Sequence, residues 1–438
     1  MRAGHWGWRL ALLVAVLGAP GLSAVTLNDQ PTGEAASSGL PPWSVQLAQD
    51  LGAVVSDDPV RASRWSRLPV LSASALAVPA DGVADSTGRL QDALDSLHNG
   101  GTLVLGPGDY VQSRCLYVRR PDVRIIGRDA TLHANNPDHM CLMVEADGFE
   151  LNGLRLTART VSRGEGLEQA RIVVLGRGAR IVGNTVDGSS SAAIWLHGAR
   201  DFVVSGNEVR NSLSDGIHSS DGTRSGRISD NVVRDTWDDG IAVVSYLKSG
   251  QCRDVVIVNN DVAGVRWGRG ISVVGSTRVL IRDNRVDAIV RAAGILVAQE
   301  WSYKTPPASA VVISGNRVSR VAATPQSASA AQTGHASIEV NSSDFLRGAY
   351  AVSQVVVVGN RIADSPVPGI RLRGQMCDIS AGGNTFERIA ASHLNSSGAV
   401  CVLDGRGCRA AGGRIVGPVL TTFCPSGAGP LPATPAGR

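Results

Sequence analysis

Residues Leu213–Ser245 read LSDGIHSSDGTRSGRISDNVVRDTWDDGIAVVS and contain two copies of one pattern. Each copy has an Asp-Gly-Ile, a turn, an apolar run and an Asn. Copies recur along much of the chain, most often 23 or 24 residues apart. The anchoring isoleucines are Ile194, Ile217, Ile241, Ile271, Ile295, Ile338 and Ile370. The asparagines are Asn184, Asn207, Asn231, Asn260, Asn284, Asn316 and Asn360, and Asn384 starts a further copy.

A repeat of this length is typical of a solenoid. The apolar runs alternate with a period of two and are bounded by Gly, Asn, Asp and Ser, so each copy contains strands joined by turns. About three short strands fit in one copy. The sequence therefore predicts an all-β fold, a right-handed parallel β-helix whose coils stack ~4.8 Å apart.

In such a stack the Ile column points inward, and so does the column two residues later. We expect the Asn column to form a ladder of amide hydrogen bonds between neighbouring coils. These columns are structural, so function is expected in the columns that point outward. The second inward column consists of Leu196, Ser219, Val243, Val273, Val297, Val340 and Leu372.

The first 24 residues predict a secretory signal peptide. They contain Arg2 and Arg9, an apolar run at Leu10–Leu17 and small residues up to Ala24. The run is too short for a permanent membrane helix. We therefore expect a secreted or periplasmic protein that has no membrane contact once the signal (1–24) is removed.

The remaining chain divides into three parts. Residues 25–77 show no period and are rich in Ser, Ala, Pro and Gly, which predicts an extended arm or linker. Residues 78–424 are expected to form the β-helix, and residues 425–438 a flexible tail.

One amphipathic helix is predicted at about residues 86–98, where Ser86 or Thr87 can cap its start and Gly100 follows its end. Its apolar side chains, at i, i+3, i+4 and i+7, are Leu90, Ala93, Leu94 and Leu97. The helix would cover the strand edges of the first coil. This passage resembles the N-terminal segment of the pectate-lyase-like superfamily, which includes polygalacturonases, rhamnogalacturonases, epimerase-like proteins and phage tailspikes. The resemblance implies the β-helix fold.

Composition argues against two function classes. The formal net charge of +4 is modest, and no basic run or aromatic-interleaved patch indicates a nucleic-acid partner. No CxxC, HExxH or paired Cys/His spacing indicates zinc. We expect no cofactor, except calcium if the protein is a lyase.

The candidate catalytic residues lie just before the anchoring isoleucines. Asp215 and Asp239 are equivalent on successive coils, with Asp238 beside them, and stacking places the two coils roughly 5 Å apart. Carboxylates this close cannot all ionise easily, so one is expected to keep its proton and act as a general acid beside a general base. Glycosidic bond cleavage requires such a pair. The structural alternative is that Asp-Gly is simply favoured at turns, because Asp bonds its own backbone and Gly accepts positive φ.

Five further residues are expected to share this surface and bind a polysaccharide: His197, His218, Tyr246, Lys248 and Arg269. Arg269 has two open roles. It could contact the carboxylate of an acidic sugar, or it could only neutralise Asp239.

The aspartates resemble the motifs of polygalacturonases, which carry Asn-Thr-Asp-Gly, Gln-Asp-Asp-Cys, Gly-His-Gly and Arg-Ile-Lys on successive coils. The corresponding segments here are LSDG (Leu213–Gly216), WDDG (Trp237–Gly240), GRGISVVGS (Gly268–Ser276) and GILVA (Gly294–Ala298). The resemblance implies that Asp239 is the general acid and that Asp215 and Asp238 hold and activate water. Arg269 replaces the family's histidine, and the Arg-Ile-Lys substrate clamp is absent.

Two alternatives remain open. A lyase or C5-epimerase on a uronate polymer would need a positive group or calcium to neutralise the sugar carboxylate and a base to take the C5 proton. The aspartates could then hold calcium. A non-catalytic glycan-binding or exopolysaccharide-assembly protein could keep the surface without the chemistry.

Seven cysteines in an exported chain predict disulfides with one cysteine left over. Cys115 and Cys141, and likewise Cys377 and Cys401, are about one coil apart, so we predict both pairs to be bonded across adjacent coils. Peptide mapping of the non-reduced protein should recover both cross-linked peptides. Recovery of either cysteine as a free thiol would contradict that pair.

Overall fold

A computed structural model describes residues 40–52, 65–342, 351–374, 376–389, 400–403, 408–410 and 420–422. The chain divides into two compact units, residues 1–38 and 39–438, and the description concerns the second. The predicted signal peptide and the predicted tail lie outside the described residues. No helix among those described is long and apolar enough to cross a lipid bilayer.

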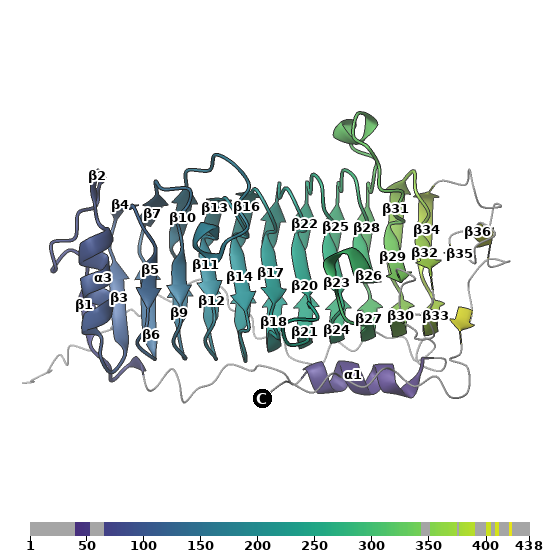
Figure 1. The fold of residues 1–438 in the computed structure, drawn as a ribbon, viewed down its shortest axis with the longest axis horizontal. Helices are drawn as coiled ribbons and strands as arrows, with labels where there is room; N and C mark the ends of the chain where they lie inside the picture. Colours follow the sequence, from purple (N-terminus) through teal and green to yellow (C-terminus); the bar gives the residue numbers. More distant parts are fainter. Residues whose placement is uncertain are drawn as a thin grey trace, which may run out of the picture. The chain divides into compact units, whose positions relative to one another are not determined.

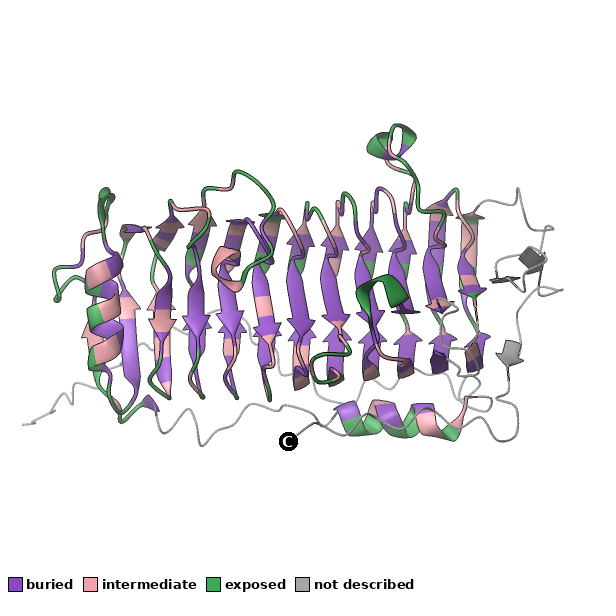
Figure 2. Ribbon diagram, in the orientation of Figure 1, coloured by how far each residue is buried: buried purple, intermediate pink, exposed green. Residues whose placement is uncertain are grey.

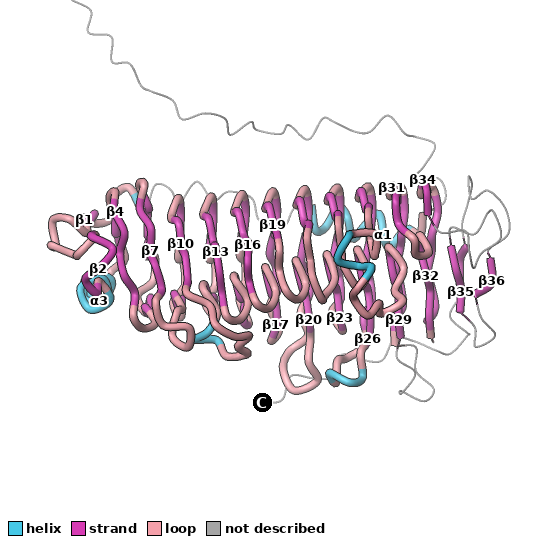
Figure 3. The backbone as a smooth tube through the Cα atoms, turned by 90° about the horizontal axis from the view of Figure 1, so that it is seen from above, coloured by secondary structure: helices cyan, strands magenta, loops and turns pink. Residues whose placement is uncertain are grey.

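Three long sheets form the described unit, and each coil adds one strand to each sheet (Figures 1 and 3). The predicted parallel β-helix is thereby confirmed. Neighbouring strands are parallel, except for the pairs β33–β37 and β35–β36 near the C-terminal end.

The first sheet consists of β1 (Val70–Ser72), β3 (Gly101–Leu105), β6 (Val123–Gly127), β9 (Glu150–Asn152), β12 (Arg180–Val182), β15 (Val203–Ser205), β18 (Arg224–Ser229), β21 (Arg253–Val258), β24 (Thr277–Arg282), β27 (Ala308–Ser314), β30 (Val352–Val358), β33 (Met376–Gly382) and β37 (Leu420–Thr422). The second consists of β2 (Asp81–Asp85), β4 (Gly108–Gln112), β7 (Ala130–Ala134), β10 (Arg155–Ala158), β13 (Thr185–Ser189), β16 (Glu208–Ser212), β19 (Val232–Arg234), β22 (Asp261–Ala263), β25 (Arg285–Asp287), β28 (Arg317–Ser319), β31 (Arg361–Ser365) and β34 (Thr385–Ile389). The third consists of β5 (Leu116–Val118), β8 (Leu142–Val144), β11 (Ile172–Val174), β14 (Ile194–His197), β17 (Ile217–Ser220), β20 (Ile241–Val244), β23 (Ile271–Val274), β26 (Ile295–Gln299), β29 (Ile338–Ser342), β32 (Ile370–Arg373), β35 (Val400–Leu403) and β36 (Cys408–Ala410).

The anchoring isoleucines pair with one another from strand to strand of the third sheet, as the sequence predicts. All of them are fully buried, and the column two residues later is buried as well. Figure 2 shows buried residues continuing along the strands of successive coils. The apolar interior therefore runs through the stacked coils, and burial of these side chains is the main stabilising term.

The Asn column forms the predicted ladder. The Nδ2 of each asparagine donates to the Oδ1 of the next, at 2.9–3.0 Å, from Asn184 through to Asn384. The backbone N–H of each asparagine donates to the same oxygen, and its Nδ2 also reaches a buried backbone carbonyl. The ladder thus satisfies polar groups that the turn would otherwise leave unpaired in the interior.

The predicted capping helix is present as α3 (Thr87–Ser96). Its four predicted apolar residues are buried in the main core. Neither candidate side chain caps its start. Instead, the carboxylate of Asp85 accepts the backbone N–H of Thr87 at 2.9 Å.

The expectation of an extended arm over residues 25–77 is wrong in two places. Residues Pro42–Gly52 form helix α1, and Val70–Ser72 already belong to the first sheet. Leu47 and Leu51 of α1 pack with apolar side chains of β21, β24, β27 and β30. The outer face of these strands is apolar where α1 covers it. The segment that contains α1 is rich in small and polar residues, so its composition does not predict this packing.

Among the described residues, short 3-10 helices occur in three loops: η2 (Leu167–Gln169), η3 (Trp301–Tyr303) and η4 (Pro325–Ala328). The loop with η3 precedes β27, and the loop with η4 follows β28.

The first predicted disulfide is confirmed, since Cys115 and Cys141 are bonded with their Cα atoms 4.6 Å apart. Cys252 is a buried free thiol. The pairing of Cys377 with Cys401 involves a side chain outside the described part. Cys377 is itself disulfide-bonded. The two backbones lie on different sheets, in β33 and β35, so the assumption that they are equivalent positions one coil apart does not hold.

The ladder predicts that Asn231→Ala strongly lowers the stability of the fold. This change would remove the acceptor of both the backbone N–H and the Nδ2 of Asn207, together with the Nδ2 donor to the carbonyl of Val204 and to Asn260 Oδ1. At about 1–3 kcal/mol for each unsatisfied buried group, we expect a loss of about 3 kcal/mol or more in the free energy of unfolding, measured by urea denaturation. Asn152→Ala is the matched control, because Asn152 is half-buried and outside the ladder. Equal effects of the two variants would contradict this role.

Candidate active site

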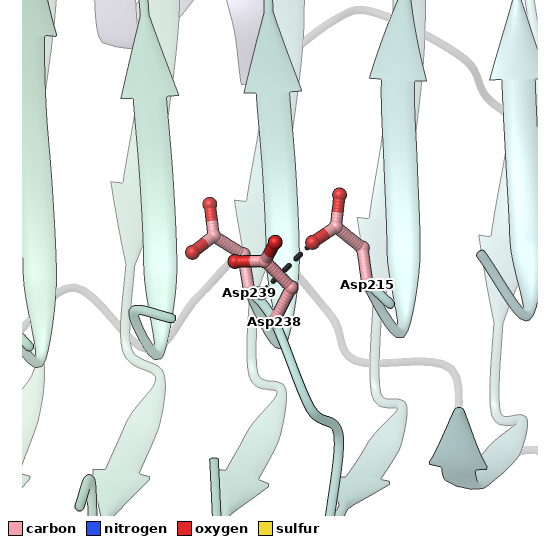
Figure 4. A group of neighbouring side chains, drawn as sticks. All are labelled: Asp215, Asp238 and Asp239. Atoms are coloured by element: carbon pink, nitrogen blue, oxygen red, sulfur yellow. Dashed lines mark hydrogen bonds between the residues drawn. The ribbon is translucent and has the colours of Figure 1, made fainter. Parts of the chain in front are cut away.

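The three predicted aspartates meet in the turns that lead into β17 and β20 of the third sheet. Asp215 lies two residues before β17, and Asp238 and Asp239 come just before β20. One carboxylate oxygen from each lies within 4.8 Å of the others. Figure 4 shows the three side chains gathered on neighbouring coils. The stacking argument from the sequence therefore places them correctly.

Each aspartate of the stacked column bonds the backbone of the next coil. Asp215 Oδ1 accepts the N–H of Asp239 at 2.8 Å, and Asp239 Oδ1 accepts the N–H of Arg269 at 2.7 Å. The structural alternative is wrong in both parts, because the bonded amides belong to the next coil and neither Gly216 nor Gly240 has a positive φ. These bonds fix the two carboxylates in place.

Glycine follows both stacked aspartates because nothing larger fits. A Cβ at Gly216 would lie 2.6 Å from Val233 Cγ1 and from the carbonyl oxygen of Gly240. A Cβ at Gly240 would lie 2.4 Å from Val262 Cγ1. The close approach of the turns brings the aspartates together as a consequence.

Asp215 and Asp239 belong to the column expected to point outward, and yet both are buried. Their exposed fractions are only 8% and 4%. Asp238 is half-buried and the most accessible of the three. The difference arises because loops and the neighbouring coils enclose the turn, which a column count cannot reveal.

Burial raises the pKa of Asp239 to about 7. Arg269 opposes this shift, the charges of Asp238 and Asp215 add to it, and a hydrogen bond from Ser272 opposes it. Ser272 Oγ donates to Asp239 Oδ2 at 2.5 Å. A carboxyl group that is protonated near neutral pH beside a second carboxylate matches the expected acid and base pair.

Burial and the nearby charge of Asp215 also raise the pKa of Asp238, against the opposing charge of Arg163. Arg163 Nη2 lies 2.8 Å from Asp238 Oδ2. This arginine sits in the loop between β10 and η2, and the sequence analysis missed it. No repeat position marks it, since a loop outside the strands delivers it to the site.

His218 pairs closely with Asp215, as its Nδ1 lies 2.5 Å from Asp215 Oδ2. Burial alone would lower the pKa of His218, but the hydrogen bond and the charge of Asp215 outweigh it, so the pKa is raised. The raised pKa favours the imidazolium form, in which Nδ1 donates to Asp215 and orients that carboxylate.

Arg269 forms ion pairs with two protein carboxylates. Its Nε lies 3.4 Å from Asp239 Oδ1, and its Nη2 lies 3.2 Å from Glu300 Oε1. The charge of Asp239 and then that of Glu300 outweigh burial and raise the pKa of Arg269. Glu300 was not anticipated from the sequence. These two ion pairs favour the charge-balancing role of Arg269 over direct contact with a sugar.

The other three predicted binding residues, His197, Tyr246 and Lys248, differ in their burial and in their partners. His197 Nδ1 lies 3.0 Å from Asp221 Oδ2, and the His197 ring meets the edge of Trp195, which also contacts the His218 ring. Tyr246 is half-buried, and burial followed by the charge of Asp215 raises its pKa. Lys248 is exposed and makes no ion pair with a residue in the described ranges.

Two tryptophans extend the surface beside the aspartates. Trp237 and Trp267 are 41% and 52% exposed, and the N–H of Trp267 donates to the carbonyl of Trp237 on the preceding coil. Arg291 lies over the Trp267 ring at 3.4 Å. Exposed rings on adjacent coils provide flat apolar surface of the kind that sugar rings pack against.

The three carboxylates are better suited to pairing with cationic side chains than to binding calcium. Calcium takes six to eight oxygen ligands, whereas each carboxylate here already has a cationic side chain beside it. These cations are His218 at Asp215, Arg163 at Asp238 and Arg269 at Asp239.

Comparisons with known proteins agree with this architecture. A family model described as "Right handed beta helix region" matches residues 110–248 and 165–386. No match was found among curated proteins.

Among solved structures, a mannuronan C-5 epimerase A-module of Azotobacter vinelandii is 15% identical, with a TM-score of 0.53 and coverage of 79% of this chain and 100% of that chain. An exopolygalacturonase of Thermotoga maritima is 10% identical, with a TM-score of 0.53 and coverage of 79% and 96%. The tailspike protein of an E. coli bacteriophage, in complex with a pentasaccharide, is 13% identical, with a TM-score of 0.53 and coverage of 74% and 62%. At these identities the likeness shows a shared fold.

The raised pKa of Asp239 predicts that the difference in the free energy of unfolding between the wild type and Asp239→Asn depends on pH. Folding raises this pKa from 3.8 to about 7, so the contribution of Asp239 to stability is full below pH 3.8 and is lost as the pH rises through 7. The free energy of unfolding of the wild type should fall relative to that of Asp239→Asn over this interval, measured by denaturant unfolding at several pH values. Asp235→Asn, at an exposed aspartate of the same coil, is the control. A pH-independent difference for Asp239→Asn would refute the raised pKa.

Proposed function

The chain belongs to the right-handed beta helix family, and on this scaffold we propose that it is an exported enzyme that cleaves glycosidic bonds in a polysaccharide. The observation that carries the proposal is the cluster of three carboxylates on adjacent coils, of which Asp239 has a pKa of about 7. A carboxyl whose pKa is near neutrality, beside two further carboxyl groups, can supply the acid and the base for this reaction. The solved structures of similar fold, whose names include a polygalacturonase and a sugar-bound tailspike, support a polysaccharide substrate.

The proposed roles follow from the contacts. Asp239 gives its proton to the leaving glycosidic oxygen, while Asp215 and Asp238 hold a water molecule and take its proton as it attacks the anomeric carbon. His218 is a positioning residue, because its bond to Asp215 fixes the direction of that carboxylate. Arg163 likewise fixes Asp238.

Accessibility supports a second assignment of the general acid. The side chain of Asp238 is 21% exposed and that of Asp239 only 6%, so Asp238 reaches a bound sugar more directly. The pKa of Asp238 is raised as well. In this assignment Asp238 gives its proton to the leaving glycosidic oxygen. Asp239 stays protonated and does not contact the substrate.

The lyase or epimerase alternative has less support. Such a reaction needs a group that accepts the C5 proton. The raised pKa of His218 favours its protonated form, and the raised pKa of Tyr246 opposes formation of a phenolate. The binding-protein alternative would not require a carboxyl with its pKa near neutrality.

A panel of polysaccharides read by two signals tests the proposal. Hydrolysis releases reducing ends without ultraviolet absorbance from unsaturated sugars, whereas a lyase produces both signals. Neither signal on any polymer, together with retained glycan binding, would refute the proposal and favour an epimerase or a binding protein.

With a substrate in hand, Asp239→Asn and Asp238→Asn should each lower kcat about a thousandfold or more, because removal of a general acid or base typically costs 10²–10⁴-fold. The matched control is Asp254→Asn, whose carboxylate pairs with Arg278 at the first sheet and lies away from the cluster. The wild-type rate should also fall as the pH rises above about 7, where Asp239 loses its proton. If the residual activity of one variant no longer falls above this pH, the residue replaced in that variant is the general acid. Full activity of both variants would remove the carboxylates from the mechanism.

A further inference from the structure

A chain of ion pairs joins the aspartates to the loop that carries η3. Arg269, two residues before β23, lies between Asp239 of the preceding coil and Glu300, which directly follows β26 on the next coil. The side chains of all three residues are largely buried. Charges in such a place are weakly screened by water, so each strongly affects its neighbours.

The two carboxylates do not share Arg269 equally. Its Nη2 donates a hydrogen bond to Glu300 Oε1 at 3.2 Å. Its Nε lies 3.4 Å from Asp239 Oδ1 without forming a hydrogen bond, and this buried atom has no hydrogen-bond partner in the described part of the chain. The guanidinium group is therefore oriented by Glu300 and not by Asp239.

Hydrogen bonds within the loop fix the backbone of Glu300. Thr305 Oγ1 accepts the N–H of Glu300 at 2.8 Å and donates to its carbonyl oxygen at 3.2 Å. The N–H of Leu247, in the loop after β20, donates to the carbonyl of Lys304 at 2.9 Å. The position of the Glu300 carboxylate is thus set by the loop and not by Arg269 alone.

Other titratable groups face Asp239 or Arg269 from the neighbouring elements. They are Asp215, Asp238, His218, Tyr246 and His335. Burial lowers the pKa of Arg269, but the charges of Asp239, Glu300, Asp238 and Asp215, in that order, outweigh burial and raise it. Glu300 is therefore the carboxylate that competes most strongly with Asp239 for this arginine.

We infer that Glu300 is a positioning residue, which draws the guanidinium group of Arg269 away from a paired hydrogen bond with Asp239 so that Asp239 keeps its proton at neutral pH. The inference rests on the proposed function and concerns the protonation of the same site. Without Glu300, the fork of Arg269 could turn to Asp239, and a bidentate pair favours the ionised carboxylate. Glu300 acts through Arg269 and takes no part in the proton transfer itself.

The pH dependence of unfolding tests this role without a substrate. The free energy of unfolding of a protein with Asp239, relative to its Asp239→Asn counterpart, falls with pH up to a limit set by the pKa of Asp239 in the folded state. In the wild type this upper pH limit should lie near 7. In Glu300→Gln we expect it about one to three pH units lower, because a newly paired positive charge lowers a carboxyl pKa by about that much.

Three further variants give the test a direction and a control. Arg269→Gln should move the upper pH limit above 7, because it removes the positive charge that lowers the pKa of Asp239. Glu300→Asp keeps a carboxylate and should move the limit less than Glu300→Gln does. Glu387→Gln is the matched control, because Glu387 pairs with Arg361 on the second sheet and its replacement removes the same charge.

The results separate the role of Glu300 from the catalytic proposal. An unchanged limit in Glu300→Gln, or an equal shift in Glu387→Gln, would overturn the inference, and Glu300→Asp decides by the same criterion if Glu300→Gln does not fold. If a polymer is hydrolysed, the pH at which kcat falls should move down in Glu300→Gln while KM stays unchanged. Release of no reducing ends from any polymer would refute catalysis and leave the unfolding result intact.

Discussion

The stacking of equivalent residues ~4.8 Å apart is the constraint on which this structure depends. Every position of a coil meets its counterparts above and below, so a residue type is suitable only if it interacts well with copies of itself. Isoleucine does so by packing in the interior, and asparagine does so by donating and accepting in register. Aspartate does not, because two stacked carboxylates repel each other. Stacked aspartates therefore raise the free energy of the fold and require compensation.

That compensation is visible around the aspartates. The backbone amides of the next coil, His218, Arg163 and Arg269 surround the carboxylates with donors and positive charge. Even so, burial keeps the pKa of Asp239 near 7, so part of the repulsion is relieved by a retained proton. A column that needed only a turn former could use one aspartate with solvent beside it. The enclosure of several aspartates by cations is the arrangement expected of a site that moves protons.

Much of the fold can be predicted from the sequence, because the repeat places equivalent residues in register without knowledge of any loop. The Ile and Asn columns, the capping helix and the Cys115–Cys141 bond follow from spacing alone. The proximity of the three aspartates follows for the same reason. Burial does not follow, because it depends on the loops around the turn. Arg163 comes from such a loop, and helix α1 covers the first sheet from a segment with no period.

The ladder begins only at Asn184, and the earlier coils are linked instead by the bond between Cys115 and Cys141. In a solenoid each coil contacts only its neighbours, so the cohesion of one end does not reinforce the other. The ladder is thus insensitive to redox conditions, whereas the cross-link between the early coils is an oxidised thiol pair. In a reducing environment the coils that carry Cys115 and Cys141 would lose their covalent link and keep only their sheet hydrogen bonds and apolar contacts, while the hydrogen bonds of the ladder would stay unchanged.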